Sequence, residues 1–101
     1  MIFEEIGDAL HCFFEAELNS DVCSRIEDPL AEQVAARLKT KPALQVVFDL
    51  KGVRYISSAF LRLCLYHCKS VGIKNFRIVN TPEDIKRVFL VAGFAEMMSI
   101  E

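Results

Sequence analysis

The sequence of 101 residues lacks a long apolar run, although 52% of its residues are hydrophobic. A helix that crosses a bilayer needs about 18 or more consecutive apolar residues, and no segment comes near that length. We therefore expect no direct insertion into a membrane. Residues 1–5 also lack the basic start and apolar stretch of a signal peptide, so we expect a cytoplasmic protein.

An excess of positive charge is also absent, since the formal net charge is -2. A nucleic-acid-binding domain usually carries a basic stripe, so the charge argues against this class of function and we expect no nucleic-acid partner. The sequence contains no Gly-rich phosphate loop, paired-carboxylate arrangement or Ser-His-Asp signature, so we expect neither an enzyme nor a cofactor. Because no repeat or linker divides the chain, residues 1–101 are expected to form a single domain.

Strand-like and helix-like segments alternate along the chain. Strands are expected over residues 3–6, 10–16, 44–50, 74–79 and 97–100. Helices are expected over residues 29–38, from after Ser57 or Ser58 to about Val71, and over residues 82–93. The resulting order is β-β-α-β-α-β-α-β. It predicts an α/β fold with a mostly parallel sheet, an antiparallel hairpin at its N-terminus, and helices packed on the sheet.

Two prolines shape the expected helix boundaries. Asp28 and Pro29 favour a helix start, which leaves residues 22–27 as a short turn or helix of their own. A single helix kinked at Pro29 is the alternative. Thr81 is expected to cap the last helix, with Pro82 at its first position.

The helix that follows Ser57 carries two apolar stripes, and one helix on one sheet face needs only one. The stripe expected to face the sheet consists of Leu61, Cys64, Leu65 and Cys68. The second consists of Phe60, Leu63 and His67, which we expect to dock a partner or a second copy of the chain. The alternative is that Phe60 tucks under a neighbouring loop or helix.

Four cysteines raise the question of a metal or thiol site. Cys64, His67 and Cys68 share one segment, but a structural zinc site needs four ligands and these supply three. Buried cysteine behaves as a small hydrophobe, so Cys64 and Cys68 are interpreted as core residues with no metal and no disulfide. Asp49, at a strand end, is expected to play a structural role in the turn that follows.

The central segment resembles the core signature of STAS domains, which are small α/β modules of anti-sigma factor antagonists and of the cytoplasmic tails of anion transporters. The resemblance rests on Val46-Val47-Phe48-Asp49-Leu50, Gly52-Val53, Tyr55-Ile56-Ser57-Ser58 and Leu61. Further matches are Leu18-Asn19, Phe76-Arg77-Ile78-Val79-Asn80 and Val88-Phe89-Leu90-Val91-Ala92-Gly93-Phe94. It implies a STAS-like fold over nearly the whole chain.

The phosphorylation loop departs from the family pattern. In register with the family, Ser57 takes the place of an aspartate, Ser58 that of the first serine, Ala59 that of the usual phosphoacceptor, and Phe60 that of a glycine. An alanine has no hydroxyl, so phosphorylation at that position is excluded. Ser58 and Ser57 remain the candidate acceptors, although an ordinary helix cap is the favoured role for Ser57.

The resemblance implies a protein-interaction module that regulates transcription or signalling. Its partner is expected to be an anti-sigma factor with serine kinase activity, or another signalling protein, bound without dependence on phosphorylation. The residues predicted to touch the partner are Ser57, Ser58, Ala59, Phe60, Leu63 and His67. The alternatives are a sensor of a nucleotide, lipid or anion at the start of the Ser57 helix, and a cytoplasmic subunit of a transporter complex.

Overall fold

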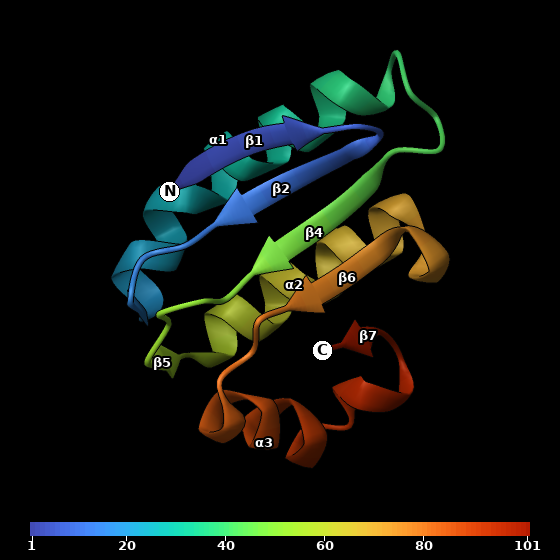
Figure 1. The fold of residues 1–101 in the computed structure, drawn as a ribbon. Helices are drawn as coiled ribbons and strands as arrows, with labels where there is room; N and C mark the ends of the chain where they lie inside the picture. Colours follow the sequence, from blue (N-terminus) through green and yellow to red (C-terminus); the bar gives the residue numbers. More distant parts are fainter.

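A computed structural model describes residues 1–101, and its centre is a five-stranded sheet in the order β1-β2-β4-β6-β7 (Figure 1). The strands are β1 (Ile2–Ile6), β2 (Ala9–Phe13), β4 (Gln45–Asp49), β6 (Phe76–Val79) and β7 (Ser99–Ile100). Only the β1–β2 pair is antiparallel. Gly7 makes its tight turn possible with a φ of +59°, a conformation that residues with a Cβ rarely adopt. The predicted hairpin and mostly parallel sheet are confirmed.

Two long helices cover one face of the sheet. The helices are α1 (Ser20–Leu38), α2 (Ser58–Val71) and α3 (Glu83–Val91), with short 3₁₀ turns at Ile73–Asn75 and Phe94–Glu96. Figure 1 shows α1 behind β1 and β2, α2 behind β4 and β6, and α3 beside the C-terminal strand. None of these helices has the length and apolar content required to span a membrane.

A second, two-stranded ladder positions the starts of α1 and α2. Strand β3 (Glu17–Leu18) pairs in parallel with β5 (Tyr55–Ile56), and each strand lies immediately before one of the two helices. The main-chain amide of Arg54 donates to the carbonyl of Ala16 at 2.6 Å and strengthens this junction. Neither strand is predictable from the sequence, because two residues are too few for an alternating pattern.

The expected element order is confirmed, but several of its details are wrong. Strands β6 and β7 begin at Phe76 and Ser99, two residues later than expected in each case. Strand β2 ends at Phe13 rather than continuing to residue 16. Helix α1 runs unbroken through Pro29, as in the single-helix alternative, because Pro29 lies on the exposed side while Val22, Ile26 and Leu30 form a buried stripe. Thr81 does not cap α3, since the helix starts at Glu83 and its flanking residue is Pro82.

Candidate functional site

The loop that leads into α2 is held by Asp49 at the end of β4. One carboxylate oxygen of Asp49 accepts a hydrogen bond from the amide of Lys51 at 3.0 Å. The other accepts from the side-chain amide of Asn80, which follows β6, at 2.9 Å. Gly52, with a φ of +81°, completes the turn. The structural role predicted for Asp49 is confirmed, and the loop is tied to two adjacent strands.

Ser57 anchors the start of α2 to the end of β3. Its amide and its hydroxyl both donate to the carbonyl of Leu18, at 3.0 and 2.8 Å. The thiol of Cys23 lies 3.9 Å from the same hydroxyl. The prediction that Ser57 caps α2 with its side chain is wrong, because the β3–β5 pairing brings a carbonyl acceptor within reach of the hydroxyl.

The next two residues differ sharply in environment. Ser58 is the first residue of α2, is exposed, and makes no hydrogen bond through its hydroxyl. Ala59 is half-buried, and its methyl group packs against the hydrophobic core. Of the predicted partner-binding residues, Ser58 therefore presents the most accessible group.

The prediction that Phe60, Leu63 and His67 form an exposed stripe is wrong. Their exposed fractions are 0%, 7% and 1%, so these side chains belong to the interior. The buried face of α2 consists of Phe60, Leu63, Cys64, His67, Cys68 and Val71. Leu61 and Leu65, which were expected to face the sheet, are only half-buried.

An aromatic cluster explains why α2 turns this face inward. The Phe60 ring lies 5.1 Å from that of Phe14 and 6.1 Å from that of Phe48, measured between ring centroids. Phe48 also makes edge-to-face contacts with Phe14 and Phe76, both at 4.9 Å. Such aromatic pairs add to the stabilisation from burial. The structure therefore agrees with the alternative in which Phe60 tucks under neighbouring elements.

The exposed face of α2 carries a different set of residues. Ser58, Arg62 and Tyr66 follow one another at four-residue spacing, and all three are exposed. Tyr55, on β5 just before the helix, is 51% exposed, and Tyr66 is 59% exposed. We call these four residues the α2 surface. Neither tyrosine was predicted to belong to the site: β5, which carries Tyr55, is too short to predict, and the residues of α2, which include Tyr66, were assigned to the wrong faces of the helix.

The cysteines have no features of a reactive or metal-binding site. Burial raises the pKa of the Cys12 thiol to about 12 and that of the Cys64 thiol well above its usual range. A nucleophilic cysteine requires a lowered pKa. No three side chains of histidine, cysteine, aspartate or glutamate converge as a metal site would require.

The anchoring role of Ser57 is testable by stability measurements. The Ser57→Ala variant is expected to lose about 1 kcal/mol of unfolding free energy, because it removes a half-buried hydrogen bond to Leu18. The matched control Ser58→Ala, which removes an unbonded exposed hydroxyl, should change stability by less than about 0.5 kcal/mol. Urea denaturation measures both. Equal losses in the two variants would contradict the anchoring role.

Comparisons with known proteins agree with this architecture. The STAS domain family model matches residues 4–101. In three dimensions the chain is similar to the anti-sigma factor antagonist SpoIIAA in its unphosphorylated form, with a TM-score of 0.72. That match has 13% sequence identity and covers 99% of this chain and 86% of the other, so it reports on the fold alone. No curated protein matches the sequence.

Proposed function

Because the chain belongs to the STAS domain family, we propose that it is a non-enzymatic protein-interaction module similar to anti-sigma factor antagonists. In this role it binds an anti-sigma factor or a similar signalling protein in the cytoplasm, and thereby regulates transcription or signalling. The partner contacts the α2 surface, with Ser58 and Ala59 at the edge of the contact.

The observation that carries this proposal is the exposure of two aromatic rings, Tyr55 just before α2 and Tyr66 on the exposed face of the helix. Tyr55 and Tyr66 are each more than half exposed, although aromatic rings bury large apolar areas when they are covered. Tyrosine and arginine are enriched among the residues that dominate binding energy at protein interfaces. Arg62 lies between Ser58 and Tyr66 on the same side of the helix.

We further propose that binding does not depend on phosphorylation. Ala59, at the position of the family's usual acceptor, cannot carry a phosphate. The hydroxyl of Ser57 is already engaged with Leu18. Ser58 is accessible, but a one-residue shift at a helix start rotates the side chain by about 100°. A kinase adapted to the usual position would therefore meet a different geometry.

Binding measurements with the anti-sigma factors of the source organism test the α2 surface. If one of them binds, Tyr55→Ala and Tyr66→Ala are each expected to weaken its affinity about tenfold or more, the loss typical of an interface aromatic residue. Isothermal titration calorimetry measures the affinity. The matched control is Ile73→Ala, which removes an equally exposed apolar side chain (64%) beyond the far end of α2. Binding by none of these proteins, or equal losses in all three variants, would contradict the proposal.

A further inference from the structure

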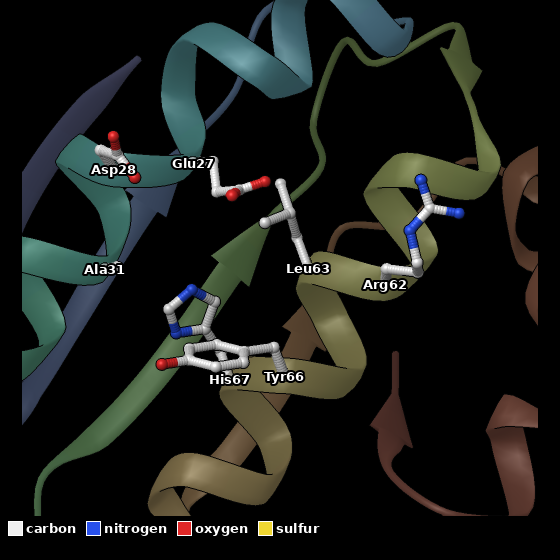
Figure 2. A pocket seen from close by; sticks show the side chains of 7 residues that line it. All are labelled: Glu27, Asp28, Ala31, Arg62, Leu63, Tyr66 and His67. Atoms are coloured by element: carbon white, nitrogen blue, oxygen red, sulfur yellow. The ribbon is translucent and has the colours of Figure 1, made fainter.

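A groove lies between the middle of α1 and the middle of α2. Its volume is about 340 Å³, and Figure 2 shows side chains from both helices around it. The lining residues are Glu27, Asp28 and Ala31 from α1, and Arg62, Leu63, Tyr66 and His67 from α2. Arg62 and Tyr66 also belong to the α2 surface, whereas the other lining residues do not.

His67 is the unexplained group in this groove. Its imidazole projects from α2 toward Ala31, across the floor of the groove (Figure 2). The side chain is 1% exposed, and neither ring nitrogen has a hydrogen-bond partner. Its ring neighbours are Tyr66, at 5.0 Å between centroids, and Phe48, at 5.9 Å. Buried polar atoms are nearly always paired in folded proteins, so the two His67 nitrogens, which no protein group bonds, are candidates to bond a ligand.

The charges around the groove favour a cation. Neither Glu27 nor Asp28 takes part in an ion pair, and Figure 2 shows the Glu27 carboxylate extending toward Leu63. The guanidinium of Arg62 points away from His67, on the far side of Leu63 (Figure 2). Burial lowers the pKa of His67 to about 4, so at neutral pH its imidazole is uncharged and does not repel a cation.

We propose that this groove binds a primary alkylammonium group. The ammonium is held by the carboxylates of Glu27 and Asp28 and donates a hydrogen bond to the unprotonated nitrogen of His67, while the alkyl chain packs on Ala31 and Leu63. Both ring nitrogens are closed to water in the present conformation. The Tyr66 ring, which lies against the imidazole, lines the same groove and is 59% exposed, so an outward turn of this ring is the movement that opens the imidazole to the ligand.

The probe for this site is butylamine, with butyrate as a control of similar size and opposite charge. We expect the His67 ring resonances in the NMR spectrum of the full chain to shift saturably with butylamine at pH 7.5, with a Kd on the order of 1 mM. Butyrate at the same ionic strength should leave them unchanged. A second arm uses Nα-acetyl-lysine methylamide; tighter binding than butylamine would identify a lysine side chain of a protein as the source of the ammonium.

Matched variants assign the site to the groove. Glu27→Gln is expected to weaken butylamine binding about tenfold, the loss typical of a hydrogen bond to a charged group. Glu32→Gln makes the same charge change at an exposed position on α1 outside the groove and should retain the affinity. Neither substitution alters the α2 surface, so this test is independent of the partner. The proposal is overturned if the shifts of the His67 resonances do not saturate with butylamine, or if butyrate shifts them in the same way. It is also overturned if both variants bind butylamine as tightly as the unaltered chain does.

Discussion

The Phe60→Ala variant is expected to lose about 3–5 kcal/mol of unfolding free energy, a large share of the stability of a small domain. Phe60 is fully buried and joins α2 to the aromatic rings of Phe14 and Phe48. Truncation removes the transfer free energy of the ring and leaves a cavity among side chains that relax only partly. Chemical denaturation monitored by circular dichroism measures the loss.

The matched comparison for Phe60 is Tyr66→Ala, which removes a large aromatic side chain from the exposed face of the same helix. We expect that variant to lose about 1 kcal/mol or less, since a side chain that is 59% exposed gains little from folding. A small loss for Phe60→Ala, combined with a large loss of partner binding, would restore the exposed docking role that the sequence had suggested for Phe60.

The second large expected effect is a loss of stability at acidic pH that arises from the burial of His67. Its pKa is about 4 in the folded protein, below the usual value of 6.5, because burial disfavours the charged imidazolium. Between pH 6.5 and pH 4 the unfolded chain therefore binds a proton that the folded chain does not. The stability associated with the neutral imidazole is fully present above pH 6.5 and is lost as the pH falls, by about 3 kcal/mol at pH 4.

Replacement by leucine isolates this contribution from that of the carboxyl groups. Between pH 7 and pH 4 the unfolding free energy should fall in both proteins, but less in the His67→Leu variant than in the unaltered chain. The difference between the two decreases should be about 3 kcal/mol. Urea denaturation at a series of pH values gives both curves, and a histidine NMR titration gives the pKa directly. Parallel curves for the two proteins, or a pKa near 6.5 for His67, would contradict the assignment.

The general fold was predictable, whereas the orientation of α2 was not. Strand periodicity, helix start signals and the signature around Asp49 are local, and they lead to the observed order of elements. On α2, however, apolar residues occupy most positions from Phe60 to Cys68, so two phases of the buried stripe fit the sequence almost equally well. The choice is made by the rings of Phe14, Phe48 and Phe76, whose convergence depends on the assembled sheet.

Tertiary contacts also override two local signals. Pro29 suggests a helix boundary, but burial of Ile26 and Leu30 on one continuous face keeps α1 intact across it. Ser57 has the residue type of a cap, but the Leu18 carbonyl, brought close by a pair of two-residue strands, takes its hydroxyl instead. The placement of the candidate site at the start of α2 thus stays a prediction, and the exposure of Tyr55 and Tyr66 became visible only in the three-dimensional structure.

We propose that a partner recognises the α2 surface irrespective of phosphorylation. The most direct test is to incubate the chain with the anti-sigma kinase that binds it, with and without ATP, and then to measure affinity and intact mass. We expect an unchanged mass and equal affinity under both conditions. A phosphate on Ser57 or Ser58 that is accompanied by loss of binding would contradict it.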